Sequence, residues 1–340
     1  MSFHGGNIYA FANQLHCLPN DIIDFSSNIH FEQAVNWHDL SNLNLVPYAD
    51  PHYTDLKRAI KQRYALGEYV DLEVFNGASS AIFALLRFLK PNDLVFYTPL
   101  YGEYAQIAQE LKSTLHVINR LTDNLFAPVP ENSTVIFVNP STPDGMCYEM
   151  AKLFKHWQTV NCTIVIDESF LDFCDAPSMA DFIASYDKLF IVKSLCKFYG
   201  CAGVRIGFVA GQFEPIAKLR SFEPAWKISS FDMAYMQEAL KNIAFIKATK
   251  DETTYLRAKL KQVLIDSNLF EKIYDGSANF VLGRLQNRNG DELQNQLARF
   301  RILIRNCESF DGLDNQDVRF AVKSKVHIEQ LAHALNACHD

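Results

Sequence analysis

The clearest pattern in this chain is a series of short apolar runs, each followed by polar or glycine-rich residues. Four of these runs lie at 93–99, 135–138, 163–166 and 189–192. Continuous apolar runs of this length are typical of strands buried inside a parallel sheet. Helical spacing in the intervening segments predicts an α/β fold with a mainly parallel central sheet. Ligands of such sheets bind at the carboxyl ends of the strands.

The run at 189–192 leads directly into a segment that carries candidate chemistry. Ser194 and Lys197 lie three residues apart, and Arg205 follows the lysine by eight residues. A lysine amine at a sheet edge can form a Schiff base with a carbonyl cofactor. A hydroxyl and a guanidinium near it can hold that cofactor's phosphate. By itself the Ser-x-x-Lys spacing favours an ordinary solvated loop lysine. The case for a cofactor lysine therefore depends on the other motifs.

Three other strand ends carry residues that could contact the same cofactor. Ser79 follows a glycine turn and is a predicted N-cap, and the free N–H groups of a helix start can bind phosphate. Tyr101 follows the run at 93–99, and taken alone it is better interpreted as an ordinary core or surface aromatic. Asp167 closes the run at 163–166, and a carboxylate there is costly to bury without a partner.

Composition narrows the class of protein. The 340 residues allow one large domain or two smaller ones, and the net charge of −7 argues against bulk nucleic-acid binding. No apolar run approaches the ~20 residues that a membrane span needs, and the first residues lack the pattern of a signal peptide. The eight scattered cysteines include no Cys-x-x-Cys pair, which predicts reduced thiols in a cytoplasmic protein and no metal site.

Taken together, these motifs resemble those of fold-type I pyridoxal-phosphate (PLP) enzymes, in which Ser-x-x-Lys is followed after seven residues by Arg-x-Gly. The chain is most similar to the L-threonine-O-3-phosphate decarboxylases of cobalamin biosynthesis, and next to the histidinol-phosphate aminotransferases. The resemblance implies a homodimer with shared active sites. It also implies an N-terminal segment at 1–39, a large PLP-binding domain at 40–230, and an interdomain helix with a small α+β domain at 231–340.

The resemblance also assigns roles around the cofactor. Lys197 would bind PLP covalently, Asp167 would keep its pyridine nitrogen protonated, and Tyr101 would stack on its ring. The residues expected to hold the phosphate are Ala78, Ser79, Ser194, Arg205 and, from the neighbouring subunit, Tyr48.

Two positions depart from the pattern of the aminotransferases. Thr142 occupies the place of an asparagine that bonds the phenolic oxygen of PLP, and a looser alignment would use Asn139 instead. Phe170 stands where aminotransferases usually carry tyrosine, which looks more like the decarboxylase branch.

The substrate side rests on two arginines and the N-terminal segment. Arg305 and Arg319 lie 14 residues apart, each after apolar strand-like residues. The resemblance implies that Arg319 binds the substrate carboxylate. It also implies that Arg305 binds the substrate phosphate, together with the segments that contain His4 and Asn28. A planar guanidinium is well suited to carboxylate and phosphate.

The predicted activity is therefore decarboxylation of O-phospho-L-threonine or O-phospho-L-serine in cobamide biosynthesis. Two alternatives stay open at this point. One is a PLP-dependent aminotransferase of the histidinol-phosphate type. The other is a degenerate PLP-fold binding protein, which the threonine at position 142 keeps in consideration.

Overall fold

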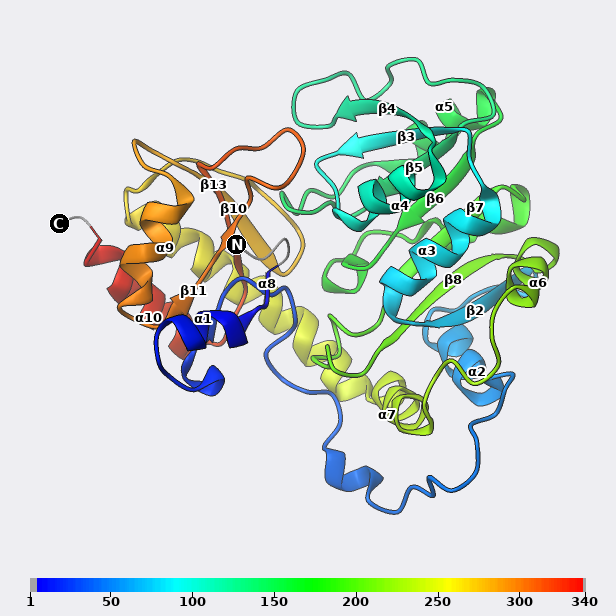
Figure 1. The fold of residues 1–340 in the computed structure, drawn as a ribbon, viewed down its shortest axis with the longest axis horizontal. Coiled ribbons are helices and arrows are strands. Elements are labelled where there is room, and N and C mark those ends of the chain that lie inside the picture. Colours follow the sequence, from blue (N-terminus) through cyan, green and yellow to red (C-terminus); the bar gives the residue numbers. More distant parts are fainter. Residues whose placement is uncertain (1–4, 339–340) are drawn as a thin grey trace.

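A seven-stranded sheet forms the centre of the computed structural model, which describes residues 5–338 (Figure 1). Across the sheet the strands are β2 (Val70–Asn76), β8 (Ile206–Gln212), β7 (Leu189–Ser194), β6 (Thr163–Asp167), β5 (Thr134–Val138), β3 (Asp93–Thr98) and β4 (Thr114–Asn119). Strand β8 is antiparallel to both of its neighbours, and every other pairing is parallel. The predicted α/β fold with a mainly parallel sheet is confirmed.

Helices cover both faces of this sheet because neighbouring strand residues point to opposite sides. Ile164 packs on one face and Val165 on the other, and each lies in a separate apolar cluster. The Val165 face is covered by α3 (Gly77–Leu89), α4 (Glu103–Leu111) and α6 (Phe213–Ser221). The Ile164 face is covered by α2 (Thr54–Arg63), α5 (Met150–Thr159) and α7 (Ser230–Lys241).

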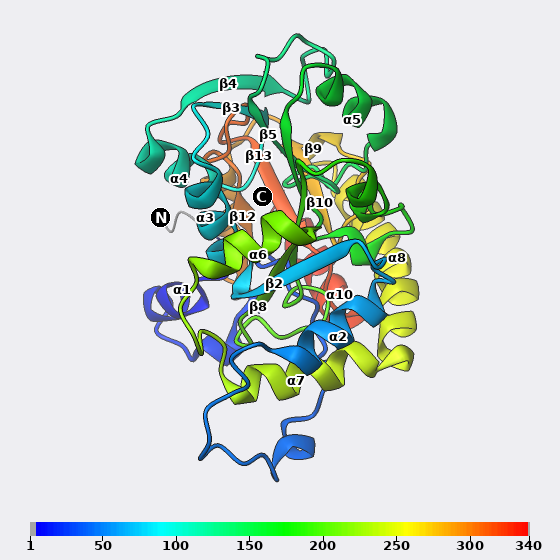
Figure 2. The same ribbon diagram turned by 90° about the vertical axis from the view of Figure 1, so that its right-hand side faces the viewer.

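A second, antiparallel sheet lies toward the C-terminus. Its order is β12 (Arg305–Asn306), β13 (Asp317–Ala321), β10 (Phe280–Leu285) and β9 (Phe270–Ile273). It is accompanied by α8 (Ile243–Asp266), α9 (Gly290–Ala298) and α10 (Lys325–Asn336). Helices α7 and α8 follow one another from the large sheet to the small one (Figures 1 and 2).

The N-terminal segment joins this second sheet region. After α1 (Ile8–Gln14), β1 (Ile23–Asp24) pairs in parallel with β11 (Ile302–Leu303). Short 3₁₀ helices complete the described elements at Pro19–Asp21, Trp37–Leu40, Leu171–Phe173 and Met179–Ser185. The domain boundaries at 39/40 and 230/231 stay predictions.

Local details differ from the sequence predictions in two places. Ser79 is not an N-cap, because α3 already begins at Gly77 and Asn76 occupies the cap position. The predicted interdomain helix is divided at Asn242, whose side chain accepts a hydrogen bond from the Phe245 amide and so starts α8. Within residues 5–338, no helix combines the length and the apolar character that crossing a bilayer would require.

Candidate active site

Lys197 lies just beyond the carboxyl end of β7 and is half-buried. Its Nζ is 3.8 Å from the centre of the Phe170 ring. Burial lowers the pKa of the Lys197 amine to about 8, while the nearby Asp167 carboxylate opposes that shift and Arg319 adds to it. A larger share of the amine is therefore neutral near physiological pH, which is the nucleophilic form.

Asp167 is the last residue of β6 and is buried. The Tyr104 hydroxyl donates to its Oδ2 at 3.0 Å, and the Ser169 backbone N–H donates to its Oδ1 at 2.9 Å. The partners that a buried carboxylate needs thus come in part from the protein itself. Burial and the Asp167 charge raise the pKa of Tyr104 well above its usual value, so its hydroxyl stays a donor.

Sequence analysis did not single out Tyr104. The only available signal was its position three residues after Tyr101, in the first turn of a helix. The pairing with Asp167 joins residues 63 positions apart and depends on α4 packing against the sheet.

The first turn of α3 meets the segment that follows Lys197. Gly77 has a positive φ of 79°, and a Cβ at this position would collide with the Arg205 guanidinium. A Cβ at Gly207 would collide with the Ala78 backbone. The Ser79 Oγ lies 3.2 Å from the Tyr101 hydroxyl. The free N–H groups of a helix start, a nearby guanidinium and two hydroxyls together make a suitable phosphate site.

The remaining predicted phosphate ligands differ in exposure. Arg205 is partly exposed, and its Nη1 donates to the Ala202 carbonyl at 3.0 Å. Ser194 is buried at the end of β7, where its backbone N–H donates to Ser169 Oγ at 3.1 Å.

Both candidates for the phenolic-oxygen contact already make protein contacts. Asn139 accepts a 2.9 Å hydrogen bond from the Tyr148 backbone N–H, which holds its amide toward the segment before α5. Thr142 Oγ1 accepts a 3.0 Å hydrogen bond from Arg319 Nη1. Because a hydroxyl that accepts one bond still has a proton to donate, Thr142 keeps a donor for a ligand.

Arg319 is a buried guanidinium next to this hydroxyl. Besides Thr142, it donates from Nη2 to the Ser26 carbonyl at 3.1 Å, and its Nε has no hydrogen-bond partner. In the part of the chain that the structure describes, no carboxylate lies within ion-pair distance of Arg319. Burial lowers the pKa of Arg319 to about 10, which still leaves it charged at neutral pH.

Arg305 lies directly opposite Arg319, on the neighbouring strand β12. Its Nη2 donates to Ser309 Oγ at 2.6 Å, and its guanidinium lies 5.4 Å from the Phe310 ring centre. A cavity of about 550 Å³ opens beside it, between the N-terminal segment and α9. Asn28 is buried with its Oδ1 unpaired, whereas His4 lies outside the described residues.

Comparison with known proteins matches residues 21–337 to the family "Aminotransferase class I and II". The chain belongs to this family. A threonine-phosphate decarboxylase of Salmonella typhimurium is 29% identical, over 98% of this chain and 96% of that protein.

Two solved structures extend the similarity to the fold. The histidinol-phosphate aminotransferase from Clostridium acetobutylicum is 27% identical with a TM-score of 0.82, over 92% of this chain and 98% of the other. The histidinol-phosphate aminotransferase from Sinorhizobium meliloti, solved in complex with pyridoxal-5'-phosphate, has a TM-score of 0.85 at 18% identity, over 98% of this chain and 94% of the other.

PLP is the cofactor of this family member, and the site residues fit it. Burial lowers the pKa of the Lys197 amine to about 8, Asp167 supplies a buried carboxylate, and the α3 start with Arg205 supplies phosphate donors. The fold-type I architecture predicted from the motifs is likewise confirmed.

Tyr48 is the one predicted cofactor ligand that lies at the surface. Its side chain is 80% exposed, and its ring stacks on Trp226 with centres 4.7 Å apart. Within residues 5–338 it makes no hydrogen bond, so its proposed role depends on a second subunit.

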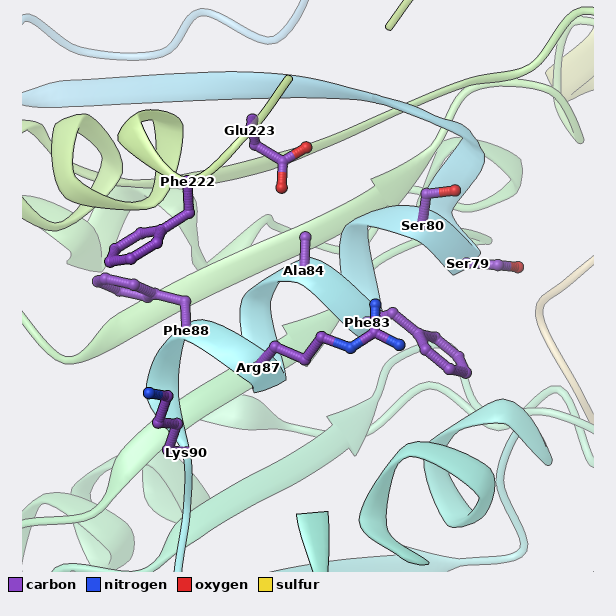
Figure 3. Close-up of a pocket in the computed structure, with 9 residues that line it drawn as sticks. All are labelled: Ser79, Ser80, Phe83, Ala84, Arg87, Phe88, Lys90, Phe222 and Glu223. Atoms are coloured by element: carbon purple, nitrogen blue, oxygen red, sulfur yellow. The ribbon is translucent and has the colours of Figure 1, made fainter. Parts of the chain in front are cut away.

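A groove of about 710 Å³ follows the outer face of α3 (Figure 3). Ser79 and Ser80 lie at one end of it and Lys90 at the other, with Phe88 facing Phe222 across the groove. The groove therefore begins at the same helix start that carries the predicted phosphate ligands.

Proposed function

We propose that this enzyme decarboxylates an O-phospho-L-amino acid, either O-phospho-L-threonine or O-phospho-L-serine. The observation that carries the proposal is Arg319, a buried guanidinium without a carboxylate partner among residues 5–338. A buried charge is costly unless an opposite charge completes it. The substrate carboxylate would supply that charge.

The second arginine supports a substrate with two anions. Cross-strand partners of an antiparallel pair have Cα atoms ~5 Å apart and project their side chains to the same face. Arg305 and Arg319 are such a pair. In a phosphoamino acid, a short Cα–Cβ–O link separates the carboxylate from the phosphate. Arg319 would bind the first and Arg305 the second, with Asn28 and His4 contributing on the phosphate side.

The apolar surroundings of Lys197 favour the loss of the substrate carboxylate as carbon dioxide. Phe170 packs edge-on against Phe280 with ring centres 5.1 Å apart, and the Arg319 guanidinium lies 5.0 Å from the Phe280 ring. A carboxylate placed against this apolar wall loses its hydration, whereas the carbon dioxide formed from it is neutral.

Each residue near Lys197 has a separate task in this proposal. PLP, when bound, supplies the electron sink. Asp167 would hold a proton on the pyridine nitrogen, assisted by Tyr104 and Ser169, and Thr142 would donate to the phenolic oxygen. The Lys197 amine, displaced by the substrate amine, would deliver a proton to the α-carbon after carbon dioxide leaves.

The test is to supply PLP and measure carbon dioxide release from phosphothreonine and phosphoserine without any 2-oxoacid. We expect release with at least one of them and none with unphosphorylated threonine or serine. Amino transfer from histidinol phosphate to a 2-oxoacid, without carbon dioxide, would instead establish the aminotransferase. That alternative is supported by the 27% identity to the Clostridium acetobutylicum enzyme.

A third outcome would identify a degenerate binding protein: covalent PLP at Lys197 with neither reaction. Position 142 is the feature that supports it, since threonine is shorter than the asparagine of the family pattern.

We further propose a homodimer in which Tyr48 reaches the cofactor phosphate of the other subunit. The support is a set of exposed aromatic side chains, one of which lines the groove along α3. Tyr48 and Trp226 are stacked at the surface, and Phe222 is 75% exposed beside the groove along α3 (Figure 3). Exposed aromatic groups of this kind are enriched at subunit interfaces.

A further inference from the structure

Three side chains that can bind a metal ion meet where the N-terminal segment crosses α8. His30, Glu32 and Glu252 each offer one ligand atom, and these atoms all lie within 4.8 Å of one another. Figure 1 shows the segment after α1 passing beside the middle of α8. The cluster belongs neither to the cofactor site nor to the arginine pair.

His30 is buried and presented in the form that binds metals. Its ring lies 4.6 Å from the Phe31 ring and 5.6 Å from the Phe245 ring, centre to centre. Its Nε2 is 3.5 Å from Thr249 Oγ1, a long contact, and within the described chain its Nδ1 has no hydrogen-bond partner. Burial, together with the Lys323 charge, lowers the pKa of His30 to about 4, so the imidazole is neutral at physiological pH.

The two carboxylates lack a balancing cation. Among residues 5–338, neither Glu32 nor Glu252 lies within ion-pair distance of a lysine, arginine or histidine. Burial first, and then the Glu32 charge, raise the pKa of Glu252. Lys323 is the cation that faces His30, and its ammonium donates to the Ser27 and Ile29 carbonyls instead. A dication between the carboxylates would relieve their mutual repulsion.

We infer that His30, Glu32 and Glu252 form a binding site for a transition-metal dication of the zinc class. One imidazole nitrogen and two carboxylate oxygens are ligands that suit zinc, and a water molecule would complete four-coordination. Magnesium and calcium prefer sites made only of oxygen.

The site needs only a small adjustment to hold the ion. Zinc–ligand bonds of 2.0–2.2 Å in a tetrahedral arrangement place ligand atoms about 3.4 Å apart. Since the donors lie within 4.8 Å of one another, they must approach by up to about 1.4 Å. Glu32 is exposed and Glu252 half-exposed, which leaves both side chains free to rotate.

An ion at this site would fasten the N-terminal segment to α8, beside the point where that segment contacts the loop that carries Lys197. The His30 backbone N–H donates to the Lys197 carbonyl at 2.9 Å. Gly200 packs so closely on the Glu32 backbone that a Cβ would collide with the Glu32 carbonyl. The role is therefore structural, and it is independent of which substrate the enzyme uses.

The experiment uses the untagged, PLP-loaded protein and zinc chloride. Zinc affinity is measured by competition with a chromophoric chelator, and the thermal midpoint is measured with and without zinc. We expect one tight zinc ion per chain and a rise in the midpoint. Glu252→Gln should weaken binding about 10- to 150-fold, because it removes one charged ligand. The double variant Glu32→Gln/Glu252→Gln should lose both effects.

Asp251→Asn is the matched control, because this exposed carboxylate neighbours Glu252 on α8 and lies outside the cluster. It should bind zinc like the unmodified protein. Equal zinc affinity and equal midpoint shifts in the double variant and in Asp251→Asn would overturn the site and point to the cysteines. Absence of saturable zinc binding in the unmodified protein would overturn it as well.

Discussion

Lys197 owes its reactivity to its surroundings more than to its residue type. Burial lowers the pKa of its amine from the usual 10.5 to about 8. In the apo form, the rate of covalent PLP attachment should therefore rise from pH 7 to pH 9 and be half-maximal near pH 8, because only the neutral amine attacks. The measurement is borohydride trapping at each pH, followed by peptide mapping.

The mapped peptide should carry its label at Lys197, and Lys197→Arg should carry none. Lys193 is a natural comparison, since it is buried and lies 3.4 Å from Asp172 in an ion pair. A label at Lys193, or a rate that does not change with pH, would contradict this prediction.

We expect the negative charge of Asp167 to be needed for turnover. Asp167→Asn should still bind PLP but reduce turnover by about 100-fold or more, because an amide cannot hold the pyridinium proton. Single-turnover and steady-state rates, with PLP content measured by absorbance, test this.

Tyr104→Phe provides the comparison for Asp167. It removes the 3.0 Å hydrogen bond to Oδ2 and keeps the carboxylate, so an intermediate loss is expected. Near-normal turnover of Asp167→Asn would show instead that this acid is structural.

The two arginines should divide the substrate between them. Arg319→Lys should weaken binding of every α-carboxylate ligand, phosphorylated or not, because a lysine cannot reproduce bidentate contacts. Arg305→Ala should weaken only phosphorylated ligands, by roughly 10- to 150-fold, and leave PLP bound. Phosphoserine and serine are compared through the change that each causes in the cofactor absorbance. Equal weakening of both ligands by Arg305→Ala would remove Arg305 as the phosphate contact.

At the scale of single elements, the start of α3 depends on a glycine. Gly77 combines a φ of 79° with contact to the Arg205 guanidinium, so Gly77→Ala must both strain the backbone and displace the arginine. We expect a loss of about 1 kcal/mol or more of unfolding free energy and faster PLP loss on dialysis. Gly67→Ala is the control, since a Cβ there meets nothing within 4 Å. If both variants retain PLP equally, the α3 start does not hold the phosphate.

Strand register determines how the two substrate-binding arginines are placed. A spacing of 14 positions between Arg305 and Arg319 would allow many distances between their side chains, and it is the β12–β13 pairing that places the two residues directly opposite each other. Neither strand makes this arrangement alone.

At the scale of the whole molecule, the proposed shared site can be tested by mixing subunits. Lys197→Ala and Tyr48→Ala should each be inactive or strongly impaired. Refolded or exchanged together, they should regain roughly a quarter of normal activity, because half of the dimers are hybrids with one intact site each. Light scattering establishes the oligomeric state. No recovery in mixtures that do contain hybrid dimers would place Tyr48 outside the shared site.

The sequence by itself determined the mainly parallel sheet and the family. Interior strands such as β5, β6 and β7 are continuous apolar runs because both of their faces are buried, so local pattern alone reveals them. The motif around Lys197 is equally local, since Ser194, Lys197 and Arg205 lie within one short stretch. These features need no knowledge of distant contacts.

Only the tertiary structure decided which distant side chains meet. The hydrogen bonds from Tyr104 to Asp167 and from Arg319 to Thr142 join positions 63 and 177 residues apart. The division of the long helix at Asn242 and the meeting of His30 with Glu252 also depend on packing between elements. The physical reason is that hydrophobic periodicity reports which face of an element is buried, whereas the residue it is buried against depends on how the elements pack.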